Sequence, residues 1–201
     1  MLQQLLDGYR TFRDEQWPQV RRHCERLADR QRPDTLVIAC SDSRVDPHSI
    51  FNAGPGELFI IRNVANIVPP CEQGEGLHGT SAAIEFAVVK LEVKTILVLG
   101  HARCGGVMAA LDHTIGADTM YLAPWISLLE PALERVAHEH DPQTALERES
   151  VVVSMERLRG FPFVAEAMRT RGLTVEGARY GVADGRLEVY HPVTKDFQNV
   201  T

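Results

Sequence analysis

Two short stretches of this sequence place thiols beside polar side chains directly after apolar runs. The first, ACSDSRVDP, carries Cys40, Asp42 and Arg44 at alternate positions. The second, LGHARCGG, carries His101 and Cys104 three residues apart. Thiolate and imidazole groups are common zinc ligands, whereas the aspartate and arginine can act on a reacting group. Together the two stretches therefore predict a reactive or metal-binding site, provided that they meet in the folded chain.

The two stretches can share one site if the strands that precede them are neighbours in a sheet. Ligands of open α/β sheets bind beyond the carboxyl ends of the strands, where the strand order reverses. Cys40, His101 and Cys104 would then form a Cys2His set that leaves the fourth zinc position open, as catalysis requires. The residues CGG lead into a helix-like run, and a helix N-terminus near Cys104 would lower the pKa of its thiol. Spacing alone leaves unrelated free thiols as an alternative.

Asp42 and Arg44 fit such a site if CSDSR remains extended. Side chains of a strand alternate with period two, so that Cys40, Asp42 and Arg44 would project to the same side. An arginine behind the aspartate keeps it ionised and oriented, and prevents it from binding the metal itself. Asp42 could then accept a hydrogen bond from a zinc-bound hydroxide. The alternative is a solvated surface pair.

Composition indicates one globular domain. The chain has 201 residues, 44% of them hydrophobic and 24% charged, which is sufficient for a substantial core. We expect a helical arm at 1–30 and an α/β core at 31–201. A formal net charge of -6 and the lack of a basic stripe argue against nucleic acid as a partner. No signal peptide or long apolar run is recognisable, so we expect a cytoplasmic protein without a membrane partner. Cys24 and Cys71 are expected to be ordinary free thiols.

The hydrophobic pattern predicts a mostly parallel central β-sheet flanked by helices. Apolar runs that are rich in β-branched residues predict strands at 35–40, 58–61, 95–100 and 173–180. Helix-like segments occur at 81–91, 107–113, 123–140 and 145–160. This alternation is typical of a single α/β domain. The sequence ADGR near the end predicts a terminal hairpin. An opening helix carries an apolar stripe formed by Leu2, Leu5, Leu6, Tyr9 and Phe12.

CSDSRVDP together with GHARCGGV closely resembles the paired signature of the β class carbonic anhydrases. The resemblance continues through PGELFIIRNVANIVPP, GTSAAIEFAVVKLEVKTILVLGH and MERLRGFPFV, and covers roughly residues 30–190. It implies one zinc ion per subunit, held by Cys40, His101 and Cys104, with Asp42 and Arg44 as the catalytic pair. The implied reaction is the reversible hydration of carbon dioxide to bicarbonate and a proton, by attack of zinc-bound hydroxide.

The resemblance is to the plant-like branch of that class, which has an open zinc site. It implies that substrate is contacted by Gln31, nine positions before the first cysteine, and by pocket residues Phe59, Val64, Phe86 and Gly105. Phe86 departs from the tyrosine of the plant enzymes, so a hydroxyl is missing there.

A second branch is inhibited by bicarbonate at a site built from a tryptophan, an arginine and a tyrosine. Arg62 and Tyr180 are present here, but Val37 occupies the tryptophan position. We therefore expect no such regulation.

The resemblance also implies a homodimer or a dimer of dimers with active sites at the subunit interface. Gln31, Phe59 and Phe86 would then face the partner's metal. The apolar stripe of the opening helix agrees with this pairing, because a helix that crosses onto a neighbour buries its stripe.

Three other functions use the same residues. A structural zinc protein would need a fourth protein ligand and would show no hydration activity. A hydrolase of an isoelectronic substrate, such as carbon disulfide, would use the same ligands behind a narrower entrance. A bicarbonate-sensing module would have lost the chemistry, although every residue that hydration requires is present.

Overall fold

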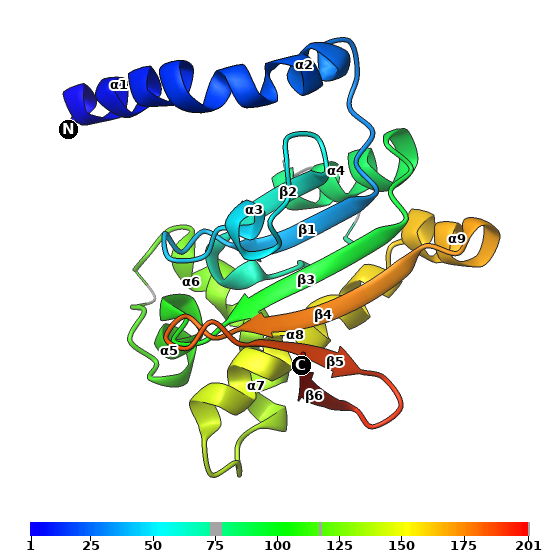
Figure 1. The fold of residues 1–201 in the computed structure, drawn as a ribbon. Helices are drawn as coiled ribbons and strands as arrows, with labels where there is room; N and C mark the ends of the chain where they lie inside the picture. Colours follow the sequence, from blue (N-terminus) through cyan, green and yellow to red (C-terminus); the bar gives the residue numbers. More distant parts are fainter. Residues whose placement is uncertain (73–77, 117, 201) are drawn as a thin grey trace.

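A six-stranded sheet forms the centre of the molecule (Figure 1). The computed structural model describes residues 1–72, 78–116 and 118–200. The strand order is β2-β1-β3-β4-β5-β6, and the pairs from β2 to β4 are parallel. The strands are β1 (Thr35–Cys40), β2 (Leu58–Asn63), β3 (Thr95–His101), β4 (Thr174–Tyr180), β5 (Leu187–His191) and β6 (Asp196–Asn199). The predicted mostly parallel α/β sheet is confirmed.

Helices connect the strands, and an arm of helices precedes the sheet. The α-helices are α1 (Leu2–Thr11), α2 (Trp17–Leu27), α3 (Pro47–Ile50), α4 (Gly79–Glu85), α5 (Gly105–Leu111), α6 (Leu122–Ile126), α7 (Glu130–Arg135), α8 (Pro142–Arg159) and α9 (Pro162–Arg171). Shorter helical segments of other types are η1 (Phe12–Gln16), η2 (Val64–Asn66), η3 (Phe86–Lys90) and η4 (Ser127–Leu129). Within the described ranges, no helix has both the length and the apolar composition to cross a membrane.

The central strand β1 is covered on both faces. Leu36 and Ile38 join the core formed with α4, α8 and α9, while Val37 and Ala39 pack on the opposite face with Leu99 of β3. All four β1 residues are fully buried. Burial on both faces explains why the apolar run of this strand does not alternate with polar residues.

The expectation of one helix over 123–140 is wrong. The segment divides into α6, η4 and α7, and residues 136–140 lie outside any helix. Pro131 stands in the first turn of α7, where a missing N–H and the proline ring favour a new helix start over continuation. Helix α9 was not predicted, although Pro162 at its start and the left-handed Gly172 after its end are the signals that mark such a helix.

The terminal hairpin is confirmed. Strands β4 and β5 pair antiparallel, with Tyr180 opposite Leu187. Gly181 donates its N–H to the carbonyl of Arg186 at 2.7 Å, and Gly185 takes the φ of 70° that the turn requires. The sheet then gains β6, which the sequence analysis did not foresee.

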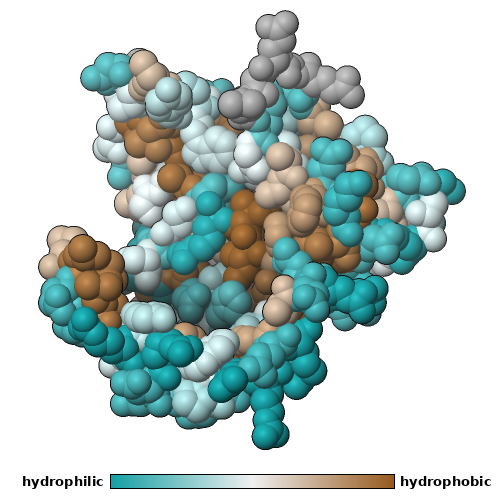
Figure 2. Space-filling view, turned by 90° about the horizontal axis from the view of Figure 1, so that it is seen from above, coloured by the Kyte–Doolittle hydropathy of each residue, from teal (hydrophilic) through white to brown (hydrophobic). Residues whose placement is uncertain are grey.

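The arm of α1, η1 and α2 projects from the body of the molecule (Figure 1). Among the described residues of these three segments, none is buried. Leu2 and Leu5 remain 71% and 69% exposed, so the predicted apolar stripe exists but is not buried by the described residues of its own chain. Seen from above, hydrophobic surface lies on the arm and on the body across the hollow that separates them (Figure 2).

Candidate metal centre

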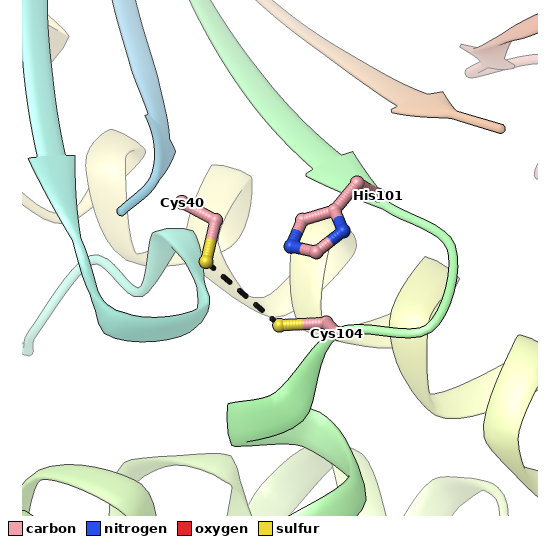
Figure 3. Close-up of side chains that lie close together, drawn as sticks. All are labelled: Cys40, His101 and Cys104. Atoms are coloured by element: carbon pink, nitrogen blue, oxygen red, sulfur yellow. Dashed lines mark hydrogen bonds between the residues drawn. The ribbon is translucent and has the colours of Figure 1, made fainter. Parts of the chain in front are cut away.

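Three ligand side chains converge where strands β1 and β3 end. These strands are neighbours, with Ala39 opposite Leu99, so that Cys40 and His101 emerge at the same edge of the sheet. Cys104 follows after a short turn and caps helix α5. Its sulfur lies 3.9 Å from that of Cys40, and the three potential ligand atoms all lie within 4.8 Å of one another (Figure 3). The predicted meeting of the two stretches is therefore confirmed.

The imidazole of His101 is oriented for metal binding. Its Nδ1 pairs with the carbonyl oxygen of Ala102 at 2.9 Å, which favours the tautomer with a free lone pair on Nε2. Nε2 is buried and lacks a hydrogen-bond partner among the described residues. A buried unpaired nitrogen needs an explanation, and a zinc ion between this atom and the two sulfurs supplies one.

The two thiols also fit a cation. The hydrogen bond from Cys104 lowers the pKa of Cys40 to about 4, and the same contact raises the pKa of Cys104. Two sulfurs this close cannot both ionise alone, whereas a divalent metal stabilises both thiolates. Backbone amides further support the sulfurs, those of Asp42 and Ala65 at Cys40 and those of Gly106 and Val107 at Cys104.

Asp42 and Arg44 form a close ion pair beside this centre. Nε of Arg44 donates to Oδ1 of Asp42 at 2.9 Å, and Nη2 donates to Oδ2 at 2.7 Å. Oδ2 also lies 3.9 Å from Nε2 of His101. The hydrogen bonds from Arg44 hold the pKa of Asp42 well below its usual range, so the carboxylate is a constant acceptor.

The side-chain alternation considered for CSDSR required an extended chain, and this condition is not met. The N–H of Val45 donates to the carbonyl of Asp42 at 3.0 Å, which closes a turn around Arg44. The backbone N–H of Arg44 also donates to Oδ1 of Asp42 at 2.9 Å. Arg44 therefore reaches the carboxylate by folding back in a turn, rather than by the alternation of a strand.

Two of the predicted pocket residues lie beside this centre. Gly105 directly follows Cys104, and Val64 directly follows Asn63, whose backbone pairs with Cys40. A cavity of about 550 Å³ begins at Asn63 and Val64 and continues between Tyr121 and Trp125. Nε1 of Trp125 donates to the carbonyl of Val64 at 2.8 Å and so fixes this wall.

The other three predicted pocket residues lie apart from the metal centre of their own chain. Gln31 precedes β1, at the end of that strand opposite to Cys40. Phe59 is paired with Leu36, and its ring lies 5.8 Å from that of Phe86, which is 45% exposed. The single chain therefore does not bring Gln31, Phe59 or Phe86 to its own Cys-His-Cys cluster.

Two residues near the centre have roles that were not predicted from the sequence. Arg62 donates to the carbonyls of Cys40, Asp42 and Val45, at 3.0, 2.7 and 2.7 Å, and so holds the first stretch in its turn. Glu147 of α8 accepts the backbone N–H of Arg103 at 2.6 Å. No local pattern marks either residue, because each contacts residues far away in the sequence.

Comparison with known proteins identifies the family. The sequence profile described as carbonic anhydrase matches residues 35–187. The chain belongs to the carbonic anhydrase family. Beta carbonic anhydrase 3 of Arabidopsis thaliana is 34% identical over 198 residues, which cover 94% of this chain and 76% of that relative. Beta carbonic anhydrase 5, chloroplastic, of the same plant is 38% identical over 174 residues, which cover 83% of this chain and 57% of the relative.

Solved structures agree with this assignment. The β-carbonic anhydrase CcaA superposes with a TM-score of 0.93 at 30% identity, over 100% of this chain and 92% of the other. One of two β-carbonic anhydrases from Sordaria macrospora, described as tetrameric, superposes with a TM-score of 0.81 at 31% identity, over 94% and 95% of the two chains. This carbonic anhydrase is thus a β-class enzyme for the zinc-dependent hydration of carbon dioxide, and its Cys-His-Cys cluster can bind one zinc ion.

Proposed function

We propose that Cys40, His101 and Cys104 hold the zinc ion of this carbonic anhydrase, and that Asp42 and Arg44 are its catalytic pair. The convergence of three buried ligand atoms within 4.8 Å carries this proposal. A zinc ion bound there supplies Lewis acidity, which makes hydroxide available near neutral pH.

Asp42 acts as a fixed acceptor for the O–H of the attacking species. The carboxylate is ionised, and therefore cannot donate to that oxygen but can orient it by accepting its proton in a hydrogen bond. Arg44 engages both oxygens of Asp42 and also donates to the carbonyl of Arg103 at 3.0 Å. The arginine therefore positions the acceptor relative to the turn that bears two of the proposed ligands.

Zinc content measured together with hydration activity tests these assignments. Cys40→Ser is expected to lose both bound zinc and the hydration of carbon dioxide, because a thiolate ligand is missing. Cys71→Ser is the matched control, since Cys71 is exposed and lies outside the cluster. A Cys40→Ser protein with a full complement of zinc and full activity would overturn the proposal.

We further propose that the enzyme is a homo-oligomer that completes its substrate pocket across the subunit interface. Val64 and Gly105 contribute to the pocket in their own chain, while Gln31, Phe59 and Phe86 face the partner's metal. The exposed stripe of α1 supports an assembly that buries it, as does the apolar surface at Phe86. A β-carbonic anhydrase from Sordaria macrospora described as tetrameric shares this fold.

We also propose that this enzyme has the open zinc site of the plant-like branch and is not regulated by bicarbonate. Val37 is fully buried in β1, so no tryptophan ring is available there for a bicarbonate site. The guanidinium of Arg62 is occupied by three backbone carbonyls, and Arg44 occupies both oxygens of Asp42. A zinc-loaded structure near neutral pH tests the proposal, because a bond between Asp42 and zinc would contradict it.

We assign the enzyme to the cytoplasm. Its four cysteines, Cys24, Cys40, Cys71 and Cys104, are all free thiols. Reducing compartments maintain thiols in this state. Fractionation of cells that produce the protein tests the assignment, with recovery in a membrane or secreted fraction as the contrary result.

A further inference from the structure

A buried carboxylate lies against the turn that joins two of the proposed zinc ligands. Glu147 in α8 is 1% exposed. Its Oε1 accepts the backbone N–H of Arg103 at 2.6 Å and the side-chain amide of Gln143 at 3.1 Å. Its Oε2 accepts Nε and Nη2 of Arg179 at 2.9 and 2.7 Å. Every oxygen of this buried group is therefore paired, as a charge inside a protein must be.

Close packing of α8 on the sheet brings Glu147 to this position. A Cβ atom at Gly100, in the strand that ends in His101, would lie 2.6 Å from Cγ2 of Val151 and 3.5 Å from the carbonyl oxygen of Glu147. A Cβ atom at Gly177 in the adjacent strand β4 would lie 2.7 Å from Cγ1 of Val151. The two glycines thus permit an approach that side chains would prevent.

The turn at residues 101–104 depends on contacts of this kind. Arg103 has a φ of 55°, in the left-handed region that non-glycine residues adopt at a cost. Its N–H is held by Glu147, and its carbonyl accepts Nη2 of Arg44 at 3.0 Å. Arg44 in turn holds Asp42. The backbone N–H and carbonyl of Arg103 therefore connect Glu147 with the Arg44–Asp42 ion pair beside the metal centre.

A network of ion pairs connects Glu147 with strands β4 and β5. Arg179 bridges Glu147 and Glu188, with Nη1 lying 3.0 Å from Oε2 of Glu188. Arg148 closes the network on Glu188 at 2.7 Å. Two arginines thereby balance two carboxylates, and the network ties α8 to β4 and β5.

We infer that Glu147 is a positioning residue of the metal centre: its carboxylate holds the turn between His101 and Cys104 and, through Arg103, the Arg44–Asp42 pair. The inference rests on the proposed zinc ligands. Removal of a residue that orients metal ligands without binding the metal commonly lowers metal affinity by about 10–100-fold.

Zinc affinity and a cobalt spectrum test this role without relying on activity. Zinc dissociation constants are measured by competition with a chelator, and the Co²⁺-substituted protein reports ligand geometry through its visible absorption. Glu147→Leu removes the acceptor, so we expect its zinc affinity to fall by about 10–100-fold and its cobalt bands to shift. Glu147→Gln retains an amide oxygen for the N–H of Arg103 and should recover most of the affinity. Glu149→Leu, on the same helix but paired with Arg135, should match the wild type.

A double variant separates positioning from a loss of folding. Glu147→Leu leaves Arg179 buried without this partner, which by itself can destabilise the protein. Glu147→Leu combined with Arg179→Met removes both charges, and replacement of such a pair by apolar residues is often neutral for stability. We expect the double variant to unfold near the wild-type midpoint and still to bind zinc weakly. Wild-type zinc affinity and an unchanged cobalt spectrum in this variant would overturn the role of Glu147, whereas a wild-type enzyme that binds no zinc would overturn the proposed function itself.

Discussion

Arg44 donates two hydrogen bonds to the carboxylate of Asp42, from Nε to Oδ1 at 2.9 Å and from Nη2 to Oδ2 at 2.7 Å. The same Nη2 also donates to the carbonyl of Arg103. The orientation of Asp42 is therefore coupled to the turn that carries His101 and Cys104, and this coupling has consequences that can be measured.

Arg44→Lys is expected to lower the hydration rate while leaving zinc bound. Lysine keeps the positive charge but cannot engage both oxygens of Asp42 in a planar fork. We expect kcat/KM to fall by about 10–100-fold, in the range found for residues that orient a metal site. Zinc content should remain at the wild-type level, because Arg44 is not one of the proposed ligands. Arg10→Lys, in an exposed pair with Asp7, is the matched control; unchanged kcat/KM in Arg44→Lys would refute the role.

The activity is expected to rise with pH, from about pH 6 to about pH 9, because two thiolates donate more charge to zinc than neutral imidazoles and make its water less acidic. Asp42 should not contribute to this rise. Its pKa is lowered by Arg44, so it is already ionised at every pH above its ordinary value of about 3.9. Arg44→Gln should therefore reduce the amplitude of the pH–rate profile without moving its midpoint. A flat wild-type profile, or a midpoint that shifts in the variant, would contradict this account.

Removal of zinc is expected to destabilise the fold. The sulfurs of Cys40 and Cys104 lie 3.9 Å apart in a buried site, and a metal that binds only the folded chain stabilises it by mass action. Free zinc at 100 times its dissociation constant should raise the free energy of unfolding by about 2.7 kcal/mol. Thermal unfolding of the chelator-treated enzyme with and without added zinc measures the change. Cys104→Ser should show no rise, and equal transitions for the wild type with and without zinc would exclude a metal in this cluster.

Two adjacent glycines should respond differently to the same substitution. A Cβ atom at Gly106 would lie 3.0 Å from Cβ of Ala65 and 3.0 Å from Cγ1 of Val64, whereas a Cβ atom at Gly105 would have no packing neighbour within 4 Å among the described residues outside its own helix. Gly106→Ala is expected to cost about 1–3 kcal/mol of stability, as overpacking does. Gly105→Ala should retain stability but slow hydration, if Gly105 lines the substrate pocket as proposed. Urea unfolding measures the stability of the two variants, and initial rates measure their activity. Equal losses of stability would contradict the predicted difference in packing between Gly105 and Gly106.

The arm should control the oligomeric state. Leu5 and Tyr9 are 69% and 59% exposed in the single chain, and their burial on a neighbour would stabilise an assembly. The double variant Leu5→Gln/Tyr9→Gln is expected to sediment as a smaller species than the wild type. Gln3→Ala, a change of a polar residue on the same helix, should leave the mass unchanged. A wild-type mass in the double variant would mean that the stripe is not part of the interface.

Features that depend on neighbouring residues could be predicted from local patterns along the chain. The apolar runs that became β1 and β3, the hairpin at Gly185, and the ligand types at Cys40 and Cys104 could all be recognised because their signals lie within a few positions. Proline placement could also have revealed the break before α7, since the effect of proline on a helix is local.

Which of these features act together depends on long-range contacts that form in the folded chain. The distance between Cys40 and Cys104 depends on the pairing of β1 with β3, and the turn that brings Arg44 onto Asp42 is held by Arg62, 17 to 22 residues away along the chain. The contact between Glu147 and Arg103 joins positions 44 residues apart. Such contacts form between segments that are remote in sequence, and no periodicity or spacing along the chain encodes them. For that reason the proposed ligands could be predicted from the sequence, while the residues that contact and orient them could be found only in the folded chain.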